Sequence, residues 1–172
     1  MANPLAYFIT FTCYGSHLHG SDSGSVDRNN NAFKGRYIPS HPARRGAEEA
    51  RMDHTPYSLD ALARDTVLQS IQQVCSHRSW KLIAAHVRTT HVHVVVQADK
   101  PPEAVMHDFK AYAARLLNQR EENAPGIKRW TRHGSTRYLW KDDEVAAAVD
   151  YVIAEQGEPM ASFPMLARRT AP

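Results

Sequence analysis

The sequence predicts an α+β domain built around an antiparallel sheet, and two observations support this prediction. Runs rich in β-branched and aromatic residues alternate with helical stripes in the order strand, helix, two strands, helix, strand, helix. The two central strand runs are separated by only a short turn, so they are expected to pair side by side. This order predicts a ferredoxin-like split βαβ sheet whose helices pack on one face.

The individual elements follow from local patterns. In the first helix Val67, Ile71 and Val74 recur at helical spacing, and Ser58 is expected to cap it. Asp142 is expected to cap the last helix, which stops at Gly157. The predicted strands are 5–14, 82–89, 91–98 and 137–140, and the predicted helices are 59–77, 102–119 and one that begins at 142.

The chain is long enough for one domain and hardly for two. It has 172 residues, 42% of them hydrophobic, which suffices for a single core. We place the domain at 1–160 and a loose C-terminal tail at 161–172. The stretch 16–57 is rich in Gly, Ser, Asp, Asn and Pro, so it is expected to form a long functional loop or a tolerated insertion.

Charge and cysteine usage narrow the class of protein. The chain carries 21 Lys and Arg against 18 Asp and Glu, and its isoelectric point of about 9.0 mildly favours a polyanionic partner. Cys13 and Cys75 have no CxxC spacing, so we expect two small buried side chains and no cysteine zinc site. No apolar run approaches the roughly 20 residues of a membrane span and no basic leader is present, so we expect a cytoplasmic protein without membrane contact.

The sharpest motif is His91-Val92-His93 inside a predicted strand. Alternation places both imidazoles on one face of the sheet, close enough to share one metal ion. An incidental polar pair is the competing interpretation. His86 is a partner for this pair only if the strand register brings it alongside, and His17-x-His19 is expected at the surface.

The next helix carries a second candidate, Tyr112. It shares an apolar stripe with Val105, Phe109 and Leu116, so it is expected to face the sheet. A core tyrosine and a reactive phenol would both occupy this position. None of the other six tyrosines is expected on such a helix.

The ordered set HVHVVV, FKAYAARLLN, RWTRHGSTRYLW and AAAVDYVIAEQGEPM resembles the single-tyrosine HUH transposases, of the insertion-sequence and REP-associated tyrosine transposase type. The resemblance implies that His91 and His93 hold Mg²⁺ or Mn²⁺ and that Tyr112 is the nucleophile. Attack on single-stranded or hairpin DNA would leave a 5′-phosphotyrosine and a free 3′ hydroxyl. The product would then be rejoined, as in DNA strand transfer.

The third metal ligand departs from the family pattern. These transposases usually carry an amide one helical turn after the tyrosine, and that position is Leu116 here. Asp108, one turn before Tyr112, and Gln119, two turns after it, are the alternatives. Water completes the ligand set if neither serves.

Positive residues gather after the tyrosine helix, interleaved with Trp130, His133, Tyr138 and Trp140. Cations that follow phosphates and aromatic rings that stack on bases are typical of single-strand binding, whereas a solvated loop is the alternative. The predicted DNA-binding residues are Lys110, Arg115, Arg120, Lys128, Arg129, Trp130, Arg132 and Arg137.

Three other functions are also compatible with the sequence. A domesticated relative would bind DNA hairpins without transposition, and a non-catalytic protein would bind metal independently of Tyr112. An RNA-binding module on a similar sheet needs aromatic residues on its central strands, whereas HVHVVV offers histidines and valines. Both a monomer and a homodimer are compatible with the sequence.

Overall fold

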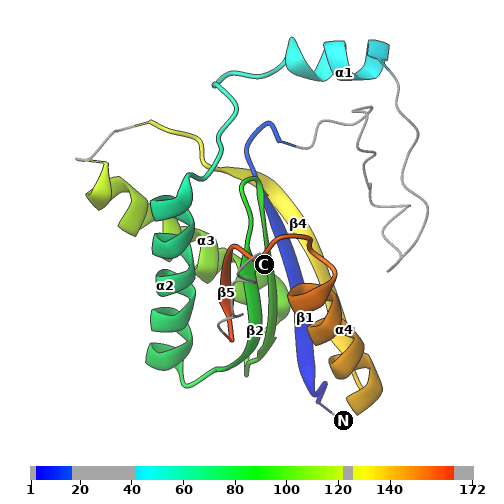
Figure 1. Cartoon of the computed structure of the whole chain (residues 1–172). Coiled ribbons are helices and arrows are strands. Elements are labelled where there is room, and N and C mark those ends of the chain that lie inside the picture. The colour runs from blue at the N-terminus through cyan, green and yellow to red at the C-terminus, as the bar shows by residue number, and fades with distance from the viewer. Residues whose placement is uncertain (1–2, 17–41, 122–125, 165–172) are drawn as a thin grey trace, which may run out of the picture.

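A computed structural model describes residues 3–16, 42–121 and 126–164, and Figure 1 shows their arrangement around one sheet. The strands are β1 (Ala6–Cys13), β2 (Lys81–Val87), β3 (His91–Gln97), β4 (Trp130–Leu139) and β5 (Ala161–Phe163). The helices are α1 (Pro42–Glu49), α2 (Ala61–Arg78), α3 (Pro102–Arg120) and α4 (Asp142–Ala154).

The sheet confirms the predicted ferredoxin-like topology. Its strand order is β4-β1-β3-β2-β5, and every pairing is antiparallel. β1, α2, β2, β3, α3 and β4 form the split βαβ unit, with β1 and β3 at the centre. The predicted turn between β2 and β3 is also present, since the Arg88 amide donates to the His91 carbonyl at 2.8 Å.

The helices occupy both faces of the sheet, which corrects the expectation of a single helical layer. α2 and α3 cover the face that carries Ile9, Phe11 and Val94. α4 covers the other face, where Ala148 and Val152 belong to a second apolar cluster with residues of four strands. Figure 1 shows α4 on the side of the sheet opposite α2. The two central strands are buried on both faces, and each face therefore needs its own cover.

Two polar segments form strands that were not predicted in full. The predicted strand 137–140 is the end of a longer strand, β4, which begins at Trp130 and is a ten-residue edge strand paired with β1. Only one edge of such a strand is paired and its side chains are half-exposed, so the alternation of apolar residues is weak. The predicted tail begins with β5, whose Ala161 pairs with Val87.

The starts of two helices also differ from the expected caps. Asp60, and not Ser58, caps α2, because its Oδ1 accepts from the Ala63 amide at 2.7 Å. At α4 the Glu144 carboxylate accepts from the Trp140 amide at 2.7 Å, one residue before the N-cap Lys141. Acidic groups at these positions stabilise the helix N-terminus.

The predicted loop 16–57 lies partly outside the described residues, which omit 17–41 and with them His17 and His19. Within its described part α1 forms, followed by an irregular segment that returns to the sheet through a hydrogen bond from the Tyr57 amide to the Tyr14 carbonyl. None of the helices in the described ranges combines the length and apolarity required to cross a bilayer.

The cysteines behave as the sequence predicts, and this leads to a simple test. Cys13 and Cys75 are free and buried, and burial raises the pKa of both thiols to about 12. Because the thiolate is the reactive form, we expect a disulfide reagent at pH 8 to label neither side chain quickly in the native protein. Both should react at once in denaturant. Fast labelling of the native protein, followed by absorbance, would contradict this burial.

Candidate active site

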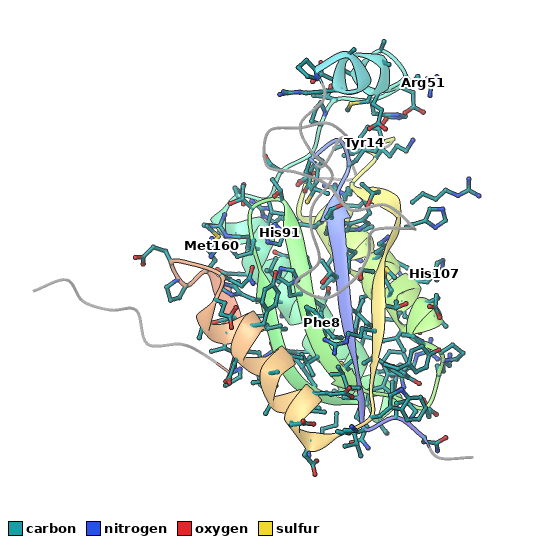
Figure 2. The ribbon with its side chains drawn as sticks, turned by 90° about the vertical axis from the view of Figure 1, so that its right-hand side faces the viewer. Phe8, Tyr14, Arg51, His91, His107 and Met160 are labelled. Carbon is teal, nitrogen blue, oxygen red and sulfur yellow. The ribbon has the colours of Figure 1, made fainter. Side chains whose placement is uncertain are left out.

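The histidine pair lies at the start of β3, on the face that α4 covers only in part. His91 and His93 have ring centroids 4.9 Å apart with an interplanar angle of 68°. Figure 2 shows His91 near Met160, beyond the C-terminal end of α4. The strand alternation predicted from the sequence therefore places both imidazoles on one face.

The surroundings of His93 keep its ring neutral. Its side chain is only 6% exposed, and its Nδ1 lies 2.8 Å from the Thr10 hydroxyl on the neighbouring strand β1. Burial is the main reason that the pKa of His93 falls to about 3, and the nearby His91 and His86 lower it further. A neutral imidazole with one nitrogen held by a hydroxyl is suited to bind a metal through the other.

Tyr151 lies directly beside this imidazole. It belongs to α4, and its ring makes edge-to-face contacts with His93, at 5.5 Å between centroids, and with Phe8, at 5.8 Å. α4 brings the phenol here because Ala148 and Val152, on the same apolar stripe, pack on the sheet. The side chain is half-buried, and a phenol thus stands against the histidine pair within a single chain.

Gln156 follows two residues after the end of α4 and bends back towards the same site. Its Nε2 donates to the Tyr151 carbonyl at 3.1 Å. A side-chain hydrogen bond with Gln156 also raises the pKa of His93, which places the Gln156 amide beside this imidazole. The amide and the His93 ring are therefore neighbours.

His86 connects β2 to α4 and to the segment that follows α4. It faces His93 across the β2–β3 pair and is fully buried. Its Nε2 accepts from the Met160 amide at 3.0 Å, so its Nδ1 carries the proton and donates to the Val152 carbonyl, also at 3.0 Å. Burial lowers the pKa of His86 and keeps it neutral. With both nitrogens bonded to backbone groups, His86 positions α4.

The donor set fits a divalent ion. Two imidazoles and an amide oxygen suit Mn²⁺, and Mg²⁺ also accepts such an oxygen. In an octahedral site with ligands at about 2.1 Å, neighbouring ligand atoms are about 3 Å apart. Hydrogen-bonded neighbours such as Gln156 and His93 are therefore placed to become adjacent ligands. The described residues contain no group of three His, Cys, Asp or Glu side chains that could hold an ion. The Gln156 amide is a further oxygen donor beside the two imidazoles.

The predicted nucleophile Tyr112 lies elsewhere. It is half-buried on α3, which packs on the opposite face of the sheet, and the Arg115 guanidinium lies 5.2 Å above its ring. Asp108 pairs with Arg78 at 3.2 Å, and Gln119 is exposed near the end of α3. Within one chain, the structure brings none of these three side chains to the histidine pair.

Most of the predicted DNA-binding cations already have partners inside the protein. Arg120 pairs with Asp60, Lys128 with Asp53, and the buried Arg129 with Glu121 and Tyr57. The Lys110 ammonium donates to two β4 carbonyls, and burial lowers its pKa to about 8. Trp130 packs against Phe11 and donates to the Lys110 carbonyl, so it serves the core. Arg137 is half-buried on β4, and Arg132 is exposed on the same strand.

The sequence contained a signal for the residues that were missed. Tyr151 was expected on no comparable helix, yet it lies on one, three residues after Ala148 and one before Val152 of its apolar stripe. Gln156 follows as an amide about one turn later. This tyrosine–amide pair has the order that the family resemblance implied, on α4 rather than on α3.

Comparison with protein-family models gives the family. The model "Transposase IS200 like" matches residues 57–152, which include both histidines of the pair, Tyr112 and Tyr151. The match spans more than half of the chain. The protein belongs to the IS200-like transposase family, a class of DNA-processing enzymes.

Solved structures agree with this assignment at the level of the fold. The REP-associated tyrosine transposase bound to a REP hairpin aligns with a TM-score of 0.50 at 10% sequence identity, over 90% of this chain and 67% of the other. A search among curated proteins found no significant match.

His86 provides a test of this arrangement. His86→Ala would leave the Val152 carbonyl and the Met160 amide without their partner and open a cavity, so we expect the free energy of unfolding to fall by about 3 kcal/mol. Urea denaturation followed by circular dichroism measures the change. The exposed His77→Ala serves as control and should stay within about 0.5 kcal/mol. Equal stability of the two variants would exclude a linking role for His86.

Proposed function

We propose that this protein is a metal-dependent single-strand DNA endonuclease and strand transferase in which Tyr151 is the nucleophile. The observation that carries the proposal is the contact of Tyr151 with His93, with Gln156 bonded to the same imidazole. Nucleophile and ligand set come from one chain, so a single subunit carries a complete site. The family match supports the reaction class.

The chemistry proceeds by exchange of one phosphoester for another. The Tyr151 oxygen attacks phosphorus, the bond to the 3′ oxygen breaks, and the phenol proton is lost as the 3′ oxygen gains one. The 5′ phosphate stays on the tyrosine and the released strand ends in a 3′ hydroxyl. Attack by a 3′ hydroxyl on the phosphotyrosine reverses the step and rejoins DNA, so no nucleotide cofactor is consumed.

Residues of the chain itself position the reacting groups. Thr10 and Gln156 orient His93, and His86 fixes the position of α4 on the sheet. The phenol is therefore held at the histidine pair before substrate arrives. His91, His93 and Gln156 would hold a divalent ion, which when bound polarises the scissile phosphate. Phe8 closes the apolar side of the site.

The proposed substrate is a DNA hairpin with an unpaired flank. The structural neighbour is described as bound to a REP hairpin, and the isoelectric point of about 9.0 suits a polyanion. A relative that only binds hairpins is the second candidate. Its prediction is tight binding without a covalent product.

The nucleophile can be identified directly. Wild-type protein mixed with labelled hairpin oligonucleotides and Mn²⁺ should form an adduct that survives denaturing electrophoresis, because the bond is covalent. We expect Tyr151→Phe to abolish the adduct and to keep DNA binding. The matched control is Tyr112→Phe, which should retain the adduct. Loss of the adduct only in Tyr112→Phe would instead assign the reaction to α3.

The metal site has a test that does not depend on activity. Titration with Mn²⁺, with the free ion followed by electron paramagnetic resonance, should give an affinity that falls about tenfold or more in His91→Ala and in Gln156→Ala. Asp108→Ala and Gln119→Ala should bind Mn²⁺ like the wild type. An unchanged affinity in Gln156→Ala would remove the amide from the ligand set.

A further inference from the structure

The edge strand β4 contains a bulge that the reaction chemistry above does not use. In its pairing with β1, Phe11 lies opposite Gly134 and Cys13 opposite Trp130. Three β4 residues, 131–133, therefore stand opposite the single residue Thr12. Extra residues of this kind leave the ladder and change the direction of their side chains, and they are common beside active sites.

This bulge is built into the protein and is not a loose irregularity. The Lys110 ammonium reaches from α3 to the Thr131 and His133 carbonyls at 2.9 and 3.0 Å, which satisfies the acceptors that the bulge frees. On the histidine face the Thr131 and Thr12 hydroxyls bond at 2.9 Å. Gly134 closes the bulge where an added Cβ would lie 2.5 Å from the Thr10 carbonyl oxygen.

The bulge presents a cation that has no internal partner among the described residues. Arg132 and its neighbour His133 are exposed, and within the described residues neither side chain has a hydrogen bond or ion pair. Most of the other predicted DNA-binding cations pair with carboxylates or donate to backbone carbonyls. A guanidinium held on a fixed backbone and free of internal partners is suited to bind phosphate.

The bulge is also close to the histidine pair. Thr12 is the register partner of His91 on one side and bonds to Thr131 on the other. Two strand spacings, about 10 Å, therefore separate the backbones of His91 and Thr131. A phosphate bound at this distance would lie next to the phosphate held at the histidines on the same strand.

We propose that the β4 bulge, through Arg132 with His133 beside it, binds a backbone phosphate of the unpaired DNA strand next to the phosphate that is cleaved. This rests on the proposed function, because it takes the histidine pair as the cleavage point. The bulge would set which linkage reaches Tyr151, since it fixes the strand one step away. Its contact is to the backbone, so it adds affinity without reading the base.

The test is the affinity and salt dependence of DNA binding, measured by fluorescence anisotropy without added divalent ion. The probes are labelled hairpin oligonucleotides with a single-stranded flank and the same hairpins without it. We expect Arg132→Ala to weaken binding of the flanked probe about tenfold and to reduce the slope of log K against log salt by about one. Arg132→Lys should restore most of both, and the hairpin without a flank should bind equally to all variants.

The control is Lys81→Ala, which removes one exposed positive charge at the other end of the sheet, opposite Gln97. If Arg132→Ala behaves like this control, the bulge does not bind phosphate. An equal loss on probes with and without the flank would also overturn the proposal, because it places the contact on the stem.

Adduct formation by the wild type is scored on the same probes. Its absence would remove the proposed function, while the flank-specific loss would still stand as a DNA contact.

Discussion

The two hydrogen bonds of His86 connect the paired strands β2 and β3 to α4, the helix that carries the Tyr151 phenol. The geometry of the site depends on this connection. A neutral imidazole has one donor and one acceptor, and here the Val152 carbonyl takes the first and the Met160 amide uses the second. A protonated ring would present two donors and oppose the Met160 N–H. The burial that keeps His86 neutral therefore also preserves the position of Tyr151, one residue before Val152.

The site forms where the apolar cover of the sheet ends. Phe8 and Val95 lie under α4, while Thr10 and the histidine pair lie on the same face beyond that cluster. The change from apolar to hydroxyl and imidazole side chains along two adjacent strands creates a place that is dry on one side and open to a polar ligand on the other. A phosphate near such a boundary interacts more strongly with fixed charges than it would in water.

The sequence predicted the topology and the histidine pair because both depend on local signals. Strand alternation placed His91 and His93 on one face, and turn residues fixed the hairpin. No local sequence pattern shows which face of the sheet each helix covers, because β1 and β3 are apolar on both sides. Tyr112 and Tyr151 both lie on helical stripes that pack on the sheet, and only the three-dimensional arrangement distinguishes them. Register likewise decided that His86 lies beside His93.

The end of α4 lies between two side chains of the candidate site, Tyr151 and Gln156. The helix stops at Ala154, so Tyr151 is held by helical geometry whereas Gln156 is placed by the turn that follows. The number of residues between the tyrosine and the amide is therefore not fixed by the roughly 3.6-residue repeat of a helix. A chain with one residue more or fewer in this turn would keep Tyr151 in place and could still return the amide to the same imidazole. A search pattern that demands a fixed tyrosine-to-amide interval would not recognise such a chain.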